Sequence, residues 1–138
     1  MEIKIQLTNA PIVAQLPSPT SGVGVGAWVE FRGVVRGEEN GVIIAALEYE
    51  AYSPMAETEM QRIIAELAGG LPCLFVRVIH RIGIVPVGET AIYVGIAARH
   101  RAEAFGLLSE FMNRLKQDVP IWKGRALTDA ELEGLKTE

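Results

Sequence analysis

The stretch that decides the fold is CLFVRVIHRIGIVPVGETAIYVGIAA, residues 73 to 98. It contains two runs rich in β-branched and aromatic residues, CLFVRVIHRIGIV and TAIYVGIAA, and such runs are typical of strands. A turn around Pro86-Val87-Gly88 joins them, because proline and glycine favour turn conformations. The middle of the chain is therefore predicted to be β-sheet.

The N-terminal half is also predicted to be mostly strand. Apolar residues alternate with polar ones at the start of the chain, and later segments are β-branched and aromatic. Gly33 interrupts one of these strands, which indicates a bulge or a close approach of two backbones. The predicted strands cover residues 3–7, 27–36 and 42–52, with a turn-rich loop at 17–26 and a turn at 37–41.

Three helices are predicted. The first begins with Ser53 as N-cap and Pro54 at the first helical position, and it ends near Ala68. Its apolar stripe consists of Met60, Ile63, Ile64 and Leu67.

The second helix is predicted over residues 103–117, with an apolar stripe formed by Phe105, Leu108, Met112 and Leu115. Pro120 stops it, so Trp122 and Lys123 are expected on a short, stiff connection. Thr128 and Glu131 form a capping-box pattern for a last short helix. The order of elements favours an α+β fold with a mixed or antiparallel sheet.

Length and composition limit the class of protein. The 138 residues fit one domain, 1–138, and a net charge of −4 weighs against a general nucleic-acid binder. The single cysteine, Cys73, is expected in the core, and one Cys with two His is poor material for a metal site. We expect no cofactor. The first residues do not resemble a signal peptide and no run is long enough to span a membrane, so a cytoplasmic protein is expected.

Cations recur where predicted elements end. They are Arg36, His80-Arg81, His100-Arg101, Lys116, Lys123 and Arg125. Such a set in an acidic protein predicts a pocket for a small anion, since Arg binds phosphate with two parallel hydrogen bonds and Lys acts as a point charge. Several of these residues also have structural alternatives: Arg36 as a solvated strand end, Lys116 as a favourable charge at a helix C-terminus, and His80 and His100 as satisfied structural histidines. The neighbouring Trp122 is most simply a hydrophobic anchor for the chain after the helix.

Five segments follow one another in a recognisable order: FRGVVR (31–36), LEYEAYSPMAE (47–57), VIHRIGIVPVGE (78–89), VGIAARHRAEAF (94–105) and LKQDVPIWK (115–123). Over about residues 26 to 125 the chain closely resembles the large, catalytic subunit family of molybdopterin synthase. The resemblance implies an α/β hammerhead-type fold with an additional antiparallel β subdomain. It also implies a homodimer within a heterotetramer, whose two small ubiquitin-like subunits end in a Gly-Gly thiocarboxylate. The implied reaction is sulfur transfer from that thiocarboxylate to cyclic pyranopterin monophosphate, which forms the dithiolene of molybdopterin.

The resemblance also implies site residues. Lys116 and Lys123 correspond to the catalytic lysines, and either could act as general acid or base. The substrate-binding positions fall on Phe31, Val34, Val35, Arg36, His100, Arg101 and Arg125. The chain departs from the family pattern after Lys123, where Gly124-Arg125 replace a basic residue followed by a glutamate.

Helix geometry adds a hypothesis about the dimer. Arg101 and Lys116 are 15 positions apart on one predicted helix, and a rise of about 1.5 Å per residue separates their Cα atoms by roughly 22 Å. A small pterin phosphate cannot bridge that distance. We therefore expect a pocket across the dimer interface, with Arg36, Lys116 and Lys123 from one chain and His100 and Arg101 from the other. The alternative function is a non-catalytic anion-binding or scaffold subunit that retains the fold.

Overall fold

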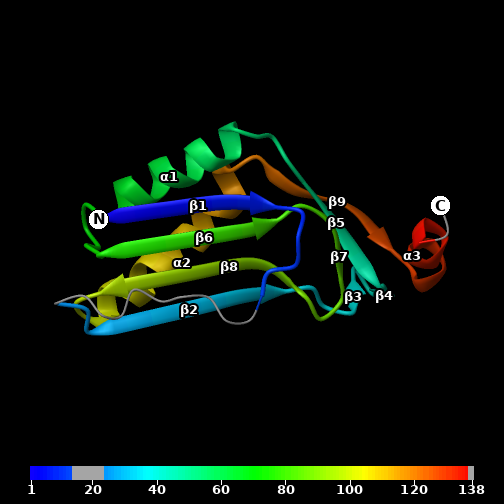
Figure 1. Ribbon diagram of the computed structural model, residues 1–138, viewed down its shortest axis with the longest axis horizontal. Helices are drawn as coiled ribbons and strands as arrows, with labels where there is room; N and C mark the ends of the chain where they lie inside the picture. Colours follow the sequence, from blue (N-terminus) through cyan, green and yellow to red (C-terminus); the bar gives the residue numbers. More distant parts are fainter. Residues whose placement is uncertain (14–23, 137–138) are drawn as a thin grey trace.

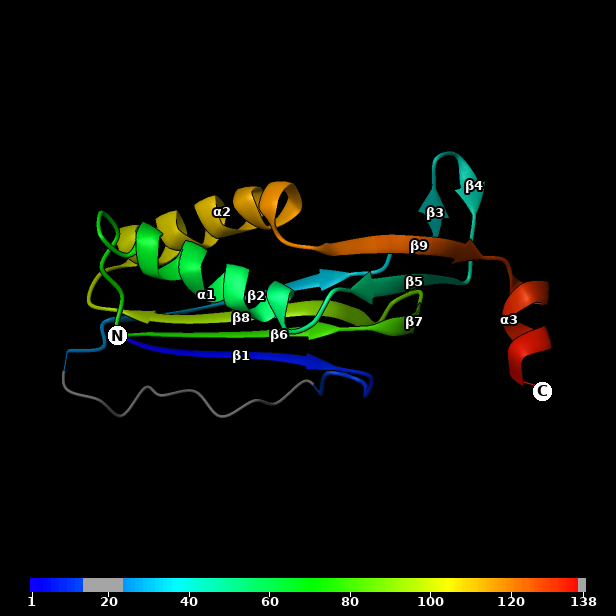
Figure 2. The ribbon, with the colours of Figure 1, turned by 90° about the horizontal axis from the view of Figure 1, so that it is seen from above.

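The computed structural model describes residues 1–13 and 24–136, so the loop predicted at 17–26 lies mostly outside the described residues. The larger layer is a four-stranded sheet in the order β1 (Glu2–Thr8), β6 (Phe75–Arg81), β8 (Thr90–Ala98), β2 (Ala27–Val34). β1 runs parallel to β6 and the other two pairs are antiparallel, so the sheet is mixed. Helices α1 (Met55–Leu67) and α2 (Arg101–Asp118) cover one face of it (Figure 2).

A second, antiparallel sheet extends from one end of the first (Figure 1). It is formed by β7 (Gly83–Pro86), β5 (Ala46–Ala51) and β9 (Ile121–Leu127), with β5 in the middle. The hairpin of β3 (Glu38–Glu39) and β4 (Val42–Ile43) and the helix α3 (Asp129–Lys136) lie at the same end (Figure 1). The fold is α+β, as predicted, and the smaller sheet is the additional antiparallel part.

The main core lies between the four-stranded sheet and the two long helices. The predicted stripe of α1 is confirmed: Met60, Ile63 and Ile64 are fully buried and Leu67 packs at the edge. For α2 the predicted stripe is partly wrong. The buried residues are Ala104, Leu107, Phe111 and Leu115.

The reason is that α2 carries two apolar stripes, and only one can face the sheet. Phe105, which belongs to the other stripe, is 57% exposed, and Leu108 and Met112 are partly buried. Spacings of three and four fit either stripe, so periodicity alone does not select between them. The result is an apolar strip on the outer side of α2.

The run CLFVRVIHRIGIV is not one strand. Gly83, with a φ of +92°, begins β7 in the second sheet, whereas β6 ends at Arg81 in the first sheet. A glycine reaches this left-handed conformation without steric cost. The strand predicted at 42–52 is likewise divided into β4 and β5. The two divisions supply β7 and β5, which are two of the three strands of the second sheet.

Gly33 behaves as predicted. The register of β2 against β8 shifts between Gly33 and Val34, and a Cβ atom on Gly33 would lie 2.7 Å from Ile92 Cγ2. The predicted bulge is thus confirmed, and the close approach is to the side chain of Ile92 rather than to a second backbone.

Helix ends differ in detail from the prediction. Pro54, not Ser53, is the N-cap of α1, and Ser53 Oγ donates a hydrogen bond to Glu57 Oε2 at 2.8 Å instead of capping the backbone. α2 begins two residues earlier than predicted. The capping box of α3 is confirmed, because Glu131 N donates to Thr128 Oγ1 at 3.3 Å and Thr128 N donates to Glu131 Oε1 at 3.1 Å.

The segment after Pro120 is a strand, not a short connection. β9 pairs with β5, and Lys123 lies opposite Tyr49. Trp122 is 46% exposed, so it is not the buried anchor that the sequence suggested, and the buried Val119 packs in the main core instead. Lys123 is held by strand pairing rather than by a rigid turn.

Candidate functional site

A cavity of about 610 Å³ opens where the two sheets and the last turn of α2 meet. Five of the predicted site residues line it: Phe31, Val34, Arg36, Lys116 and Lys123. They come from the end of β2, the loop after it, the last turn of α2 and β9. The fold thus brings residues that are far apart in sequence around one cavity.

The two lysines of this cavity come from different elements, α2 and β9. Lys116 follows the buried Leu115, whose packing fixes the last turn of α2. The pairing of β9 with β5 sets the position of Lys123. Its Nζ atom lies 3.5 Å from Glu39 Oε1 on the β3–β4 hairpin. The cavity therefore combines three cations with one carboxylate at its edge.

Two aromatic side chains also line the cavity wall: Tyr49, which sequence analysis missed, and His80, which it expected as a cation. Their rings meet edge to face with centroids 5.3 Å apart. His80 is 4% exposed, and burial lowers its pKa, so it is neutral at pH 7. Its Nδ1 atom lies 2.9 Å from the carbonyl oxygen of Arg81, which fixes Nδ1 as the donor and leaves Nε2 as an acceptor.

Tyr49 is a neutral group as well. Burial, assisted by the charge of Glu39, raises the pKa of its phenol. The sequence places Tyr49 on the apolar side of its strand. From the sequence alone, a residue in a cavity wall cannot be distinguished there from a residue in the core. Tyr49 and His80 thus contribute uncharged polar groups to the cavity wall.

Arg81 does not contribute to the cavity. Its guanidinium is buried, and Nη1 lies 2.6 Å from Glu89 Oε1. The pairing of His80 and Arg81 as pocket cations, suggested by their position at a strand end, is therefore not what the structure shows. One residue is a neutral wall group and the other a buried ion-pair partner.

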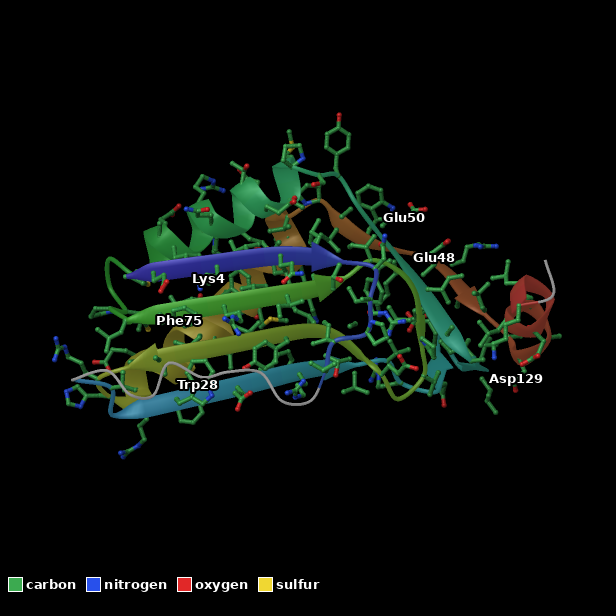
Figure 3. The ribbon with its side chains drawn as sticks, viewed as in Figure 1. Lys4, Trp28, Glu48, Glu50, Phe75 and Asp129 are labelled. Atoms are coloured by element: carbon green, nitrogen blue, oxygen red, sulfur yellow. The ribbon has the colours of Figure 1, made fainter. Side chains whose placement is uncertain are left out.

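Two further predicted site residues do not line the cavity. Val35 is 3% exposed and packs in the smaller apolar cluster with Ile44, Leu47 and Val85. Arg125 Nε donates a hydrogen bond to Glu48 Oε1 at 3.0 Å. Glu48 and Glu50 project from the same side of β5 (Figure 3), and Glu50 accepts a hydrogen bond from Trp122 Nε1 at 2.9 Å. These side-chain hydrogen bonds join β9 to β5.

His100 and Arg101 lie at the opposite end of α2, in a separate hollow of about 490 Å³ that Gly26, Arg99 and Phe105 also line. A third hollow, along the outer side of α2, is lined by residues of the exposed stripe, Phe105, Leu108 and Met112, and by Lys116. Within one chain, the structure therefore does not bring His100 and Arg101 to the lysines.

Within residues 1–13 and 24–136, none of the helices combines the length and apolar character that a membrane span requires. The same part of the chain holds no cluster of three or more His, Cys, Asp or Glu side chains placed to bind a metal ion.

Comparison with known proteins assigns the chain to a family. The sequence model of the MoaE family, described as MoaE protein, matches residues 6–118. A human protein named molybdopterin synthase catalytic subunit is 40% identical over 98 residues, which cover 71% of this chain and 52% of that protein. A protein of the same name from Mesorhizobium japonicum is 37% identical over 133 residues, covering 96% of this chain and 82% of that protein.

The solved structures agree. The crystal structure of molybdopterin synthase from Staphylococcus aureus matches with a TM-score of 0.75 and 32% identity over 93% of this chain and 91% of that chain. The mammalian relatives are longer, and the chain spans about half of their length. The range matched by the family model includes Phe31, Val34, Arg36 and Lys116 of the cavity but ends before Lys123. The chain belongs to the MoaE family.

Proposed function

We propose that this protein is the catalytic subunit of a molybdopterin synthase, a sulfurtransferase of molybdenum cofactor biosynthesis. Its substrates are cyclic pyranopterin monophosphate and the thiocarboxylated C-terminus of a small ubiquitin-like subunit. The observation that carries the proposal is the convergence of Arg36, Lys116 and Lys123 on one cavity in a chain of this family. The name carried by its relatives supports the same reaction.

The cavity suits two anions. Arg36 can bind phosphate oxygens with two parallel hydrogen bonds, and the lysines act as point charges. Phe31 and Val34 offer apolar surface beside these cations, against which a flat pterin ring can pack. Substrate phosphate and carrier tail can therefore share one site.

The reaction requires two kinds of step. The thiocarboxylate sulfur attacks a carbon of the pterin side chain, and a C–S bond forms while a C–O bond at that carbon breaks. The departing oxygen leaves as water after protonation or stays on the substrate phosphate, and the carrier's acyl group stays on sulfur. Water then attacks the acyl carbon, the acyl–sulfur bond breaks, and the tail leaves as a carboxylate. We assign Lys116 and Lys123 to proton transfer and to stabilising the charge that develops in these steps.

The proposal includes a homodimer with two small subunits. His100 and Arg101 then complete the cavity of the partner chain, because α2 separates them from Lys116 of their own chain by roughly 22 Å at its rise per residue. The exposed stripe of α2 supports this arrangement, since apolar side chains on a surface favour contact with another protein. Val35 and Arg125 stay in the proposal as substrate-binding predictions, with Arg125 requiring release from Glu48.

The chain is proposed to act as one domain over residues 1–138, and a cytoplasmic location stays a prediction from the sequence. Reconstitution tests the function. Purified protein, thiocarboxylated small subunit and cyclic pyranopterin monophosphate should yield molybdopterin, measured as its fluorescent oxidation product. A small subunit without its last two glycines should give no product. Absence of product with the intact carrier would favour the alternative, a non-catalytic anion-binding subunit.

A further inference from the structure

A carboxylate lies against one of the two lysines of the cavity. Glu39 Oε1 is 3.5 Å from Lys123 Nζ, and the Glu39 side chain is 24% exposed whereas that of Lys123 is 50% exposed. Glu39 belongs to the β3–β4 hairpin, which projects beside β9 (Figure 2). The acid is therefore the better buried and better fixed member of the pair.

The hairpin itself holds Glu39 in this place. Asn40 and Gly41 have φ values of +53° and +79°, and two consecutive positive φ values are typical of the tight two-residue turn that joins such strands. Adjacent residues of a strand point to opposite sides. Glu38 accordingly lines a hollow with Arg36 and Asn40 on the far side of the hairpin, while Glu39 faces Lys123.

Three strands bring polar groups to the same point. Tyr49 of β5 lies opposite Lys123 in the β5–β9 pairing. The charge of Glu39 adds to burial in raising the pKa of the Tyr49 phenol, so the carboxylate is close to that ring as well. Lys123 is therefore paired with Glu39 across the hairpin and lies beside Tyr49 on the neighbouring strand, at the edge of the cavity.

Stability does not explain this arrangement. A half-exposed ion pair contributes little to the free energy of unfolding. A carboxylate also opposes the entry of an anion into the same cavity. Any favourable effect of Glu39 on the reaction must therefore come through Lys123, whose long side chain loses rotamer freedom when the ion pair holds it in one place.

We propose that Glu39 is a positioning residue, which holds the Lys123 ammonium at the cavity wall until an anionic substrate replaces it as the counter-ion. This inference rests on the proposed function of the cavity. Holding Lys123 before the substrate arrives reduces the reorganisation needed when charge develops. Glu39 does not touch the reacting atoms.

The test uses three variants of the full chain. Glu39→Gln removes the charge and keeps the shape, Glu38→Gln removes a charge from the other side of the same hairpin, and Glu39→Asp restores the charge on a shorter side chain. In the reconstituted reaction, Glu39→Gln should lower kcat about fivefold to tenfold. It should leave KM unchanged or lower, because a negative charge has left the cavity. Glu38→Gln should match the wild type, and Glu39→Asp should recover most of kcat.

A second measurement does not depend on activity. The order of the Lys123 side chain, from ¹³C relaxation of its Cε atom, should fall in Glu39→Gln to that of the exposed Lys116, but not in Glu38→Gln. Unchanged order in Glu39→Gln overturns the inference, as does a kcat equal to that of Glu38→Gln or a raised KM with normal kcat. An inactive wild type would instead contradict the proposed function, and the order of Lys123 would still decide whether Glu39 positions it.

Discussion

The two ends of helix α2 both carry cations, in very different surroundings. At the C-terminal end, Lys116 faces residues of both sheets across a cavity of about 610 Å³. At the N-terminal end, His100 and Arg101 are exposed, and only neighbouring loop and helix residues surround their hollow. The first end opens into a cavity whose walls come from several elements of one chain. The second is a charged surface hollow, which in our proposal becomes a site when a partner chain covers it.

The difference shows why charge alone is a poor guide to a site. Both ends have cations that can bind phosphate, but the wall of the C-terminal cavity also contains Tyr49 and the buried His80, whereas the neutral residues of the other hollow are Gly26, Ala102 and Phe105. Charges in a less polar surrounding interact more strongly with a bound anion. On this view, a partner chain supplies to His100 and Arg101 what the second sheet supplies to Lys116.

The largest expected effect separates the buried stripe of α2 from the exposed one. Phe111→Ala should lower the free energy of unfolding by about 3–5 kcal/mol, because Phe111 is 1% exposed in the main core. Phe105→Ala should cost less than about 1 kcal/mol, since its side chain is mostly exposed. Urea unfolding measures both. Equal losses would mean that the wrong stripe has been placed in the core.

A chemical probe reports on the packing of the N-terminal end. Cys73 is buried, and its Sγ atom lies 3.7 Å from the carbonyl oxygen of Glu103 in the first turn of α2. Burial raises the pKa of this thiol from 9.0 to about 11. A raised pKa keeps the thiol protonated at neutral pH, and only the thiolate reacts.

Alkylation of native Cys73 by iodoacetamide at pH 8 should therefore be about a hundredfold slower than that of an exposed cysteine. The rate should rise steadily as the pH approaches 11. Protein unfolded in urea serves as the control and should react at the ordinary rate. Rapid reaction of the folded protein at pH 8 would show that this end of α2 opens readily.

At the C-terminal end, each lysine is expected to matter for turnover. Lys116→Ala and Lys123→Ala should each lower product formation more than tenfold, which corresponds to a loss of about 1.4 kcal/mol in transition-state stabilisation. Lys136→Ala in α3, outside the cavity, is the matched control and should be fully active. Near-normal activity of both cavity variants would remove these lysines from the mechanism.

A smaller effect is expected from the apolar strip that joins the two ends. Phe105→Asp should raise the dissociation constant of the homodimer about tenfold, because a charge would be buried where two chains meet. Glu110→Lys also changes charge on α2, at an exposed position that lines neither hollow of the helix, and should leave the dimer unchanged. Sedimentation analysis over a range of concentrations distinguishes the two variants. A Phe105→Asp dimer as tight as the wild type would place the interface elsewhere.

Several features of the two ends and of the fold around them could be predicted from the sequence, because they depend on residues that are close together in the chain. The capping box at Thr128, the bulge at Gly33 and the end of α2 before Pro120 each depend on neighbouring residues, and each was predicted. Motif order likewise indicated Arg36, Lys116 and Lys123 as members of one cavity.

Features that depend on distant contacts were not predictable. Gly83 divides an apolar run between two sheets only because a second sheet exists to receive β7. β9 is a strand because β5 offers an unpaired edge. Glu39 faces Lys123 across 84 positions of the chain, a pairing that no local pattern reveals. The choice between the two stripes of α2 is likewise made by the sheet on which the helix packs.

The central claim is that the two ends of α2 meet in one site only when two chains combine. The most direct test mixes two inactive variants, Arg101→Ala and Lys116→Ala, under conditions that exchange chains. One of the two cavities in each mixed dimer then has every residue intact, and statistical exchange places half of the dimers in this mixed form. The account predicts that activity returns, to about a quarter of the wild-type value per chain. Mixed dimers that have exchanged chains and stay as inactive as their parents would contradict it.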